Sequence, residues 1–163
     1  MLIQTQIALL TKKTKYAVKA LMALARNTEN RPMLIADIAK GDALPKKFLE
    51  AILLELKRGG FLSSKKGAGG GYYLLKTAEE IKLSAIIRVI DGPIALLPCV
   101  SLNFYEKCAE CIDEHYCGIR DVMANVRDAT LKVLGDTSIA DMVHREDTLA
   151  KAEGKVADDR VVG

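Results

Sequence analysis

Four cysteines lie close together in the second half of the chain, separated by eight, two and five residues: Cys99, Cys108, Cys111 and Cys117. Thiolates bind soft metals and iron–sulfur clusters, and a Cys-x-x-Cys pair is a common source of two ligands. A structural zinc site usually contains two such pairs, whereas this chain has one. The residues alone leave three interpretations open: an iron–sulfur cluster, zinc or a thiol-based redox switch, and cysteines without a chemical role.

Acidic residues surround these cysteines, but no catalytic constellation accompanies them. They are Glu106, Glu110, Asp113 and Glu114. No nucleophile and no group that would stabilise an oxyanion stands beside them, so a solvated acidic rim is the simpler interpretation. The sequence therefore predicts no enzyme and no catalytic residues.

A second chemical feature is a glycine-rich loop at residues 67–71, which directly follows Lys65 and Lys66. Cations and backbone amides at one loop tip can hold phosphates. We therefore expect contacts with DNA phosphates from Lys65, Lys66, Gly67, Gly70, Gly71 and Tyr72. The alternative is a nucleotide-binding loop, but the Gly-Lys-Ser/Thr motif and a helix opening from the glycines are both absent.

The segments before this loop predict a helix-turn-helix. Apolar residues at helical spacing indicate a first helix that begins near Thr14, and residues 34–39 form a short second one. After a tight turn at residues 41–44, Pro45 starts a third helix that ends at Gly59 and turns inward Phe48, Leu49, Ile52, Leu53 and Leu56. The segments 61–65 and 72–75 then read as two strands of a hairpin, which makes the loop a wing.

The third helix has the character of a recognition helix. Lys46 and Lys47 lie at its start and Glu50 follows one turn later, so all three can reach base edges or phosphates in the major groove. The competing interpretation is an ordinary solvated helix face. The wing that follows this helix favours DNA binding. We expect further DNA contacts at the start of the first helix, from Lys12, Lys13, Lys15 and Tyr16.

A long helix follows the cysteines. Apolar residues at alternating steps of three and four indicate a seam of about two heptads: Ile119, Val122, Val126, Ala129 and Val133. The same row would suit the core face of a monomeric helix. Two DNA half-sites one helical turn apart require a two-fold protein, which favours a homodimer. Thr137 and Ser138 can cap one more turn, residues 139–143, and the polar residues from His144 onward predict a mobile tail.

The charged residues divide the chain into a basic first part and an acidic second part. Residues 1–98 contain 16 Lys and Arg against 8 Asp and Glu, whereas residues 99–163 contain 8 against 13. A basic first part suggests a module that binds a polyanion. Residues 1–10 resemble no signal peptide, and no apolar run approaches the roughly 18 residues of a membrane span, so we expect a cytoplasmic protein that binds no membrane.

Together these elements predict a mainly α fold with a small β-hairpin (α+β). A winged helix-turn-helix is expected over residues 1–92, a cysteine loop and dimerisation helix over 93–143, and a disordered tail over 144–163. The most direct function for this arrangement is sequence-specific binding of double-stranded DNA by a homodimer.

The sequence resembles the Rrf2 family of bacterial transcription regulators, which includes iron–sulfur biogenesis, nitric-oxide-sensing and cysteine-metabolism regulators. The resemblance rests on residues 13–18, on Ile38-Ala39, on residues 44–53 and on Gly70-Gly71-Tyr72, and it spans roughly residues 11–143. It implies a homodimer on a pseudo-palindromic operator, with the long helix as the dimer element. Lys66 stands where the family usually has arginine, which prefers narrow minor grooves.

The resemblance also implies a role for the cysteines. In the cluster-binding relatives three cysteines lie between the winged domain and the long helix, and five residues separate the last two. Cys111 and Cys117 match that pair, Cys99 takes the place of the first, and Cys108 is either a fourth ligand or dispensable. We therefore expect an iron–sulfur cluster, with zinc as the alternative cofactor. A cluster-free regulator under the control of a protein partner or a small ligand is the alternative function.

Overall fold

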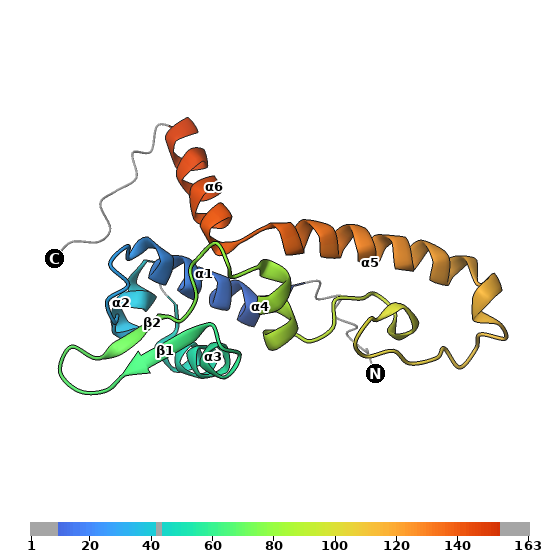
Figure 1. The fold of residues 1–163 in the computed structure, drawn as a ribbon, viewed down its shortest axis with the longest axis horizontal. Coiled ribbons are helices and arrows are strands. Elements are labelled where there is room, and N and C mark those ends of the chain that lie inside the picture. The colour runs from blue at the N-terminus through green and yellow to red at the C-terminus, as the bar shows by residue number, and fades with distance from the viewer. Residues whose placement is uncertain (1–9, 42–43, 154–163) are drawn as a thin grey trace, which may run out of the picture.

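The computed structural model describes residues 10–41 and 44–153. The predictions for residues 1–9 and for the end of the tail, residues 154–163, concern parts of the chain outside these ranges. Four helices and a hairpin form a compact body, and a long helix projects away from it (Figure 1). No helix in the described ranges combines the length and the apolar character needed to cross a membrane.

The predicted helix-turn-helix is confirmed. Helix α1 spans Lys12–Arg26, α2 spans Ile35–Lys40 and α3 spans Lys46–Arg58. Helix α1 begins two residues earlier than predicted because the Thr11 side chain caps it, accepting from the Thr14 N–H at 3.2 Å. Helix α3 ends at Gly59, and Gly60 follows with a φ of 77°, a conformation that glycine adopts without strain.

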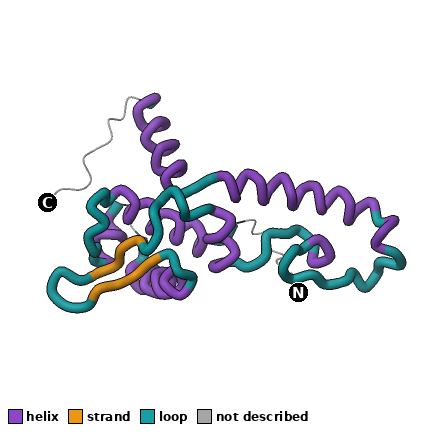
Figure 2. The backbone as a smooth tube through the Cα atoms, in the orientation of Figure 1, coloured by secondary structure: helices purple, strands orange, loops and turns teal. Residues whose placement is uncertain are grey.

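The predicted wing is also present. Strands β1 (Leu62–Lys65) and β2 (Gly71–Leu74) pair antiparallel, with Leu62 opposite Leu74 and Lys65 opposite Gly71. The hairpin lies beside α3 and its loop extends beyond the helical body (Figure 2). The mainly helical class with one small hairpin is therefore correct.

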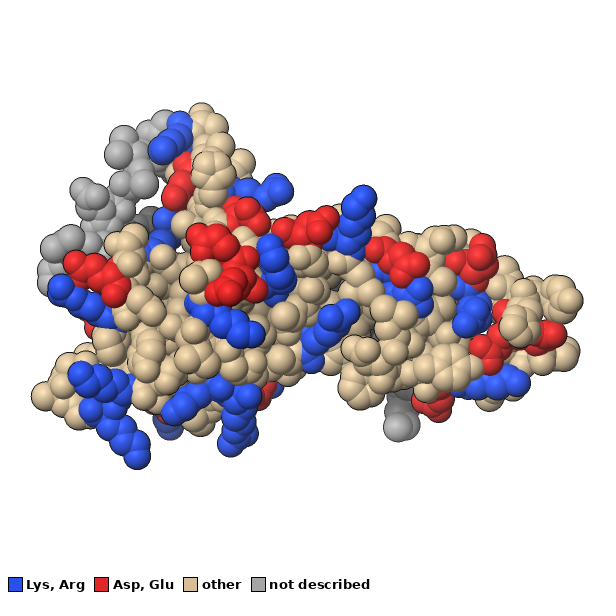
Figure 3. All heavy atoms as spheres, viewed as in Figure 1, with Lys and Arg blue, Asp and Glu red and all other residues tan. Residues whose placement is uncertain are grey.

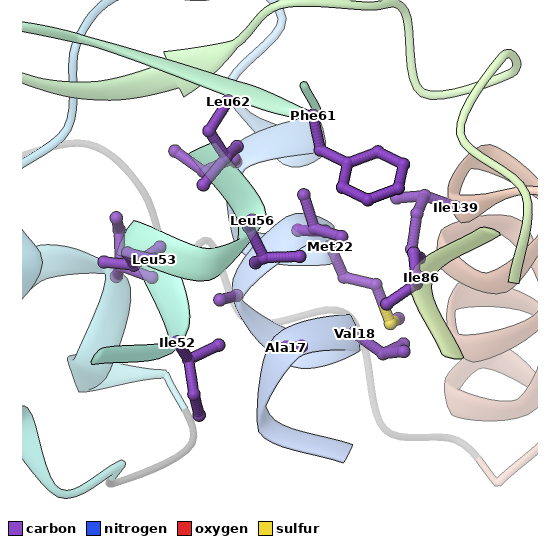
Figure 4. Close-up of a cluster of buried hydrophobic side chains, with 14 of the residues drawn as sticks. Ala17, Val18, Met22, Ile52, Leu53, Leu56, Phe61, Leu62, Ile86 and Ile139 are labelled. Atoms are coloured by element: carbon purple, nitrogen blue, oxygen red, sulfur yellow. The ribbon is translucent and has the colours of Figure 1, made fainter. Parts of the chain in front are cut away.

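The core lies between α1, α3 and α4 (Leu83–Ile90). Leu21, Leu53 and Ile86 are among its fully buried side chains, and Phe61 closes it on the side of the hairpin (Figure 4). Phe48 was predicted to point inward, but it is 41% exposed. It lies at the edge of the apolar stripe of α3, where its ring meets that of Tyr16 edge-on at 5.7 Å.

The chain then leaves the body. Residues 98–117, here called the cysteine loop, contain two short 3-10 helices, η1 (Pro98–Val100) and η2 (Glu114–Tyr116). The loop runs beside α5 (Gly118–Asp136), which returns the chain to the body (Figure 1). Helix α5 contacts α4 near the body and η1 further out.

The predicted mobile tail is wrong for residues 144–152. Helix α6 spans Ile139–Ala152, well beyond the single turn predicted at residues 139–143. Ser138 and Asp141 form a capping box at its start, and α6 packs against α1. Two ion pairs fix the packing: Arg26 contacts Glu146 at 2.8 Å and Asp147 at 2.7 Å.

The core of the winged domain therefore extends beyond residue 92. Ile139 has no exposed surface and belongs to the same apolar cluster as α1 and α3. Met142 and Val143 pack against this cluster from α6. A boundary at residue 92 does not enclose the whole core.

Asp91 joins the end of α4 to the start of α1. Its carboxylate accepts from the Thr11 hydroxyl at 2.5 Å and from the Thr11 N–H at 3.2 Å. Burial opposes ionisation of Asp91, but the hydrogen bonds from Thr11 outweigh it and hold the pKa of this carboxyl below its ordinary value. The charged form is thus favoured in the folded protein.

Replacing Asp91 with asparagine should make stability less dependent on pH. A depressed pKa in the folded state stabilises the protein above the ordinary Asp pKa of about 4, and this contribution is lost as the pH falls through the folded value. Because Asp91 is exposed, the effect should not exceed about 1 kcal/mol. Urea unfolding at pH 7 should show Asp91→Asn less stable than the parent protein, and the difference should shrink as the pH is lowered below about 4. A difference that stays the same throughout the acid range would contradict this linkage.

Candidate nucleic-acid interface and cysteine loop

One surface of the body presents the predicted recognition residues. Lys46, Lys47 and Glu50 are exposed on α3, opposite the buried stripe that contains Leu49 and Ile52. In the view of Figure 3, Lys and Arg side chains gather along the edge formed by α3 and the wing, whereas Asp and Glu gather over the base of α6 and both signs of charge mix along α5. A helix face of this kind, flanked by a basic hairpin, is suited to the major groove of DNA.

The wing tip exposes cationic side chains, but some backbone N–H groups of the glycine loop are already hydrogen-bonded within the protein. Lys65, Lys66 and Gly67 are exposed at the tip. The prediction of free backbone amides in the glycine loop is wrong for Gly70, because its N–H donates to the Gly67 carbonyl at 2.9 Å. The Tyr72 N–H donates to the Met33 carbonyl, also at 2.9 Å, so these two amides shape the wing and are not available to a phosphate. Since the glycines lead into β2 and not into a helix, the loop also lacks the geometry of a nucleotide-binding phosphate loop.

The base of the wing is fixed to the turn between α1 and α2. Met33 and Tyr72 exchange two backbone hydrogen bonds, of 2.8 and 2.9 Å. The Asn30 side chain pairs with both backbone groups of Leu74, accepting from its N–H and donating to its carbonyl, each at 3.0 Å. Asn30 has a φ of 49°, which asparagine tolerates better than most residues. Sequence reasoning did not find this anchor, since its partners lie 44 residues apart.

Gly71 allows this close approach. A Cβ atom at this position would lie 2.3 Å from the Met33 carbonyl oxygen, and the φ of Gly71 is 145°. The Gly70-Gly71-Tyr72 motif is thus explained by backbone packing at the base of the wing.

The residues predicted to bind DNA at the start of α1 have different environments. Lys12 and Lys15 are exposed. Lys13 instead forms an ion pair with Glu55 of α3, at 2.7 Å, and Tyr16 is half-buried against Phe48. The structure therefore gives Lys13 and Tyr16 a packing role between α1 and α3, which a local pattern does not reveal.

Two basic residues at the end of α3 were missed by the sequence analysis. Lys57 donates from its Nζ to the Ser64 hydroxyl of β1 at 2.6 Å, and Arg58 is exposed beside it. Lys57 thereby links α3 to the hairpin. The signal available in the sequence was the basic last turn of the helix, which also complements the negative end of the helix dipole.

The four cysteines occupy three environments. Cys99 is buried in η1, and the exposed Cys108 donates to the Glu110 carboxylate at 3.3 Å. Cys111 and Cys117 are half-buried and near enough for each thiol to affect the pKa of the other. Cys108 also affects the pKa of Cys111.

The start of α5 makes the pKa values of these two thiols differ. Cys117 is the N-cap of α5. The nearby backbone N–H of Arg120 lowers the pKa of the Cys117 thiol, although burial opposes this shift. Burial raises the pKa of the Cys111 thiol, and the neighbouring Cys117 thiol adds to this shift. Negative charge thus gathers on Cys117, as expected for a thiol at the N-terminus of a helix.

Polar side chains fold the loop back on itself. The Tyr105 hydroxyl donates to the Glu114 carboxylate, which raises the pKa of Tyr105. The same carboxylate lies 3.4 Å from Arg120 Nε in the first turn of α5. This Tyr105–Glu114–Arg120 chain holds both arms of the loop against the end of α5 that bears Cys117.

The predicted ligand set is only partly assembled. In the described part of the chain no three His, Cys, Asp or Glu side chains gather in a geometry that could hold a metal ion. Cys111 and Cys117 supply two thiols, whereas the turn that bears Cys99 is fixed to α5. Val100 is 2% exposed, and its carbonyl accepts from Arg127 Nη1 at 2.5 Å. The thiol chemistry suits an iron–sulfur cluster, but this arrangement does not.

The predicted seam residues form an exposed row, here called the outer row of α5. Ile119, Val122 and Val133 are 68%, 53% and 65% exposed, Val126 is 38% exposed, and Ala129 is exposed as well. They do not form the core face of a monomeric helix, because other residues of α5, such as Arg127, face η1 and α4. The row is therefore free to contact another molecule.

Comparisons with known proteins agree with this architecture. The model of the Rrf2 family, described as an iron-dependent transcriptional regulator, matches residues 10–145. A putative Rrf2-like HTH-type transcriptional regulator of Rhodobacter capsulatus is 41% identical over 146 residues, which are 88% of this chain and 97% of that protein. The HTH-type transcriptional regulator IscR of Serratia proteamaculans is 27% identical over 151 residues, 93% of this chain and 88% of that protein.

Solved structures show the same fold. CymR, the global cysteine regulator of B. subtilis, aligns with a TM-score of 0.69 at 27% identity, covering 83% of this chain and 96% of its own. IscR of T. potens aligns with a TM-score of 0.65 at 26% identity, covering 91% and 92%. The matching relatives are named as transcriptional regulators and not as enzymes. The chain belongs to the Rrf2 family of winged helix-turn-helix transcriptional regulators.

Proposed function

We propose that this protein is a homodimeric regulator that binds a pseudo-palindromic operator in double-stranded DNA and acts in the cytoplasm. The observation that carries the proposal is the basic surface formed by α3 and the wing. Lys46, Lys47 and Glu50 are exposed on α3, the hairpin strand β1 contacts α3, and Lys65 and Lys66 are exposed at the tip of that hairpin. Phosphate contacts from the tip would orient the protein, and the α3 side chains would read base edges.

The outer row of α5 supports the homodimer. Five small and medium apolar side chains with heptad-like spacing are exposed on a helix that projects from the body. Packing of two such rows about a two-fold axis would bury them and would set the separation of the two recognition helices.

We further propose that the cysteine loop is the sensing site. Thiol groups are concentrated there, and the loop caps the first turn of α5 through Cys117. An iron–sulfur cluster held by Cys99, Cys111 and Cys117, with Cys108 in addition or dispensable, would supply redox chemistry at this site. Such binding requires Cys99 to leave its packing against α5. Zinc is the alternative metal for the same thiols.

Replacing Lys66 with alanine should weaken binding to every duplex and reduce the slope of log affinity against log salt by about one unit, because one phosphate contact is lost. Replacing Glu50 with alanine should instead change the preferred base at one position of the operator. The binding free energy that distinguishes this base from the others should change by about 1–3 kcal/mol. Titrations of an operator selected from random duplexes, and of a scrambled duplex, at several salt concentrations distinguish these effects.

Lys151→Ala is the charge-matched control, since Lys151 is exposed on α6, far from the wing. It should leave the salt slope unchanged. If Lys66→Ala and Glu50→Ala both bind like the parent protein, α3 and the wing are not the DNA-binding surface.

A further inference from the structure

A line of four exposed residues runs along α3 on the side opposite its buried stripe. Lys47, Ala51, Leu54 and Arg58 follow one another at steps of four, three and four residues, which places them on one face of the helix. All four are exposed, and Leu54 is 46% exposed. The stripe on the other side is buried and consists of Leu49, Ile52, Leu53 and Leu56. The exposed face thus has a cation at each end and two apolar side chains between them.

The exposure of Leu54 differs in kind from that of Phe48. Phe48 lies at the edge of the buried stripe, and its ring contacts Tyr16 of α1. Leu54 instead lies on the side of α3 opposite the stripe, where packing within the body cannot stabilise an apolar side chain. The apolar character of this position therefore has no explanation in the core.

The charges around Ala51 and Leu54 favour a polyanionic partner. Four of the six charged side chains of α3 are cationic, and all four are exposed: Lys46, Lys47, Lys57 and Arg58. Of the two carboxylates, that of Glu55 forms an ion pair with Lys13 at 2.7 Å. An apolar pair framed by cations matches DNA, in which phosphates border the groove that exposes the base edges.

The length of the line suits the major groove. Position 58 is eleven residues after position 47, which corresponds to about 16 Å along the helix axis, whereas the groove is about 12 Å wide. Cations at the two ends can therefore reach the phosphates that border the groove while the apolar pair faces the base edges. Among the four bases, only thymine presents a methyl group there.

We propose that Ala51 and Leu54 recognise thymine methyl groups in each half-site of the operator. The inference rests on the proposed function, because it requires α3 to lie in the major groove. Apolar side chains at these positions bury the methyl group and offer no hydrogen-bond partner to the polar edges of guanine and cytosine. Loss of one such contact should weaken operator binding about fourfold, the factor for burying one carbon group of this size.

The test compares thymine with uracil, which lacks only the methyl group and keeps the same base pairing. The full-length parent protein first selects an operator from random duplexes. Each thymine of this operator is then replaced in turn with deoxyuridine, and fluorescence anisotropy gives the dissociation constant. Replacement at a recognised position should weaken binding about fourfold, and replacement elsewhere should leave it unchanged.

Two variants assign the effect to the side chains. Leu54→Ala and Ala51→Ser should each bind the thymine and uracil forms equally well at one position and keep the preference at the position that the other residue recognises. Their affinity for a scrambled duplex should not change, because it depends on phosphate contacts. Both residues are exposed, so circular dichroism should show native helix content. Leu149→Ala is the matched control, since Leu149 is an exposed leucine on α6, away from α3 (Figure 1), and it should preserve the preference for thymine.

Two results would overturn the inference: an operator in which no uracil replacement weakens binding of the parent protein, or a preference for thymine that persists in both variants. If the preference persists in one variant alone, the residue replaced in that variant does not recognise a methyl group. A parent protein that selects no operator refutes the proposed function, and the inference with it. A parent protein that selects an operator but binds every uracil form equally well refutes the inference alone.

Discussion

Replacing Val126 with aspartate should convert the proposed homodimer to a monomer and abolish tight operator binding. Val126 lies at the centre of the outer row, and two-fold packing would bring two uncompensated carboxylates into an apolar contact. The cost should be at least about 4 kcal/mol, roughly a thousandfold in the dimer dissociation constant. Sedimentation velocity should show a monomer, and far-ultraviolet circular dichroism should show near-native helix content.

Asn125→Asp is the matched control, because it places the same charge on the neighbouring exposed residue outside the row. This variant should remain a dimer. If Val126→Asp also remains a dimer at concentrations where the parent protein is one, α5 does not form the interface, and another surface must hold the two subunits together.

Replacing Gly71 with alanine should destabilise the base of the wing by about 2–4 kcal/mol. The added Cβ would lie 2.3 Å from the Met33 carbonyl oxygen and 2.5 Å from its carbon, both backbone atoms that cannot move without breaking the pairing with Tyr72. The positive φ of Gly71 adds strain for any residue with a side chain. Urea unfolding gives the loss of stability, and binding of operator DNA should fall with it.

Gly67→Ala separates the clash from the strain. Gly67 also has a positive φ, of 90°, but an added Cβ there meets nothing within 4 Å. It should cost about 1 kcal/mol from backbone strain alone. Equal losses in the two variants would show that the contact with Met33 is not what requires glycine at position 71.

Local sequence patterns predicted the elements in which apolar residues recur at regular spacing within one segment. The buried stripe of α3, the hairpin after it and the exposed outer row of α5 all follow from spacing within one segment. The family resemblance added the pseudo-palindromic operator and the choice of Cys99, Cys111 and Cys117 as cluster ligands. Both approaches depend on residues near one another in the chain.

The features that were missed depend on partners far apart in the chain. Most of α6 lacks an apolar period, and Arg26 stabilises it from 120 residues away. Asn30 and Lys13 are similarly explained only by Leu74 and Glu55. The three candidate ligand cysteines show the same limit, because Arg127 holds the turn that bears Cys99 against α5. Spacing predicts which side chains are available, but tertiary packing determines which of them meet.

The position of Ile139 in the core affects how the protein folds during its synthesis. The ribosome completes α4 at Ile90, yet the apolar cluster of α1 and α3 lacks its last member until Ile139 has been made. At about 5–20 residues per second, this interval lasts roughly 2–10 seconds. During that time α6 cannot cover the surface of α1 that it contacts in the folded protein, so we expect the nascent chain to expose apolar surface there.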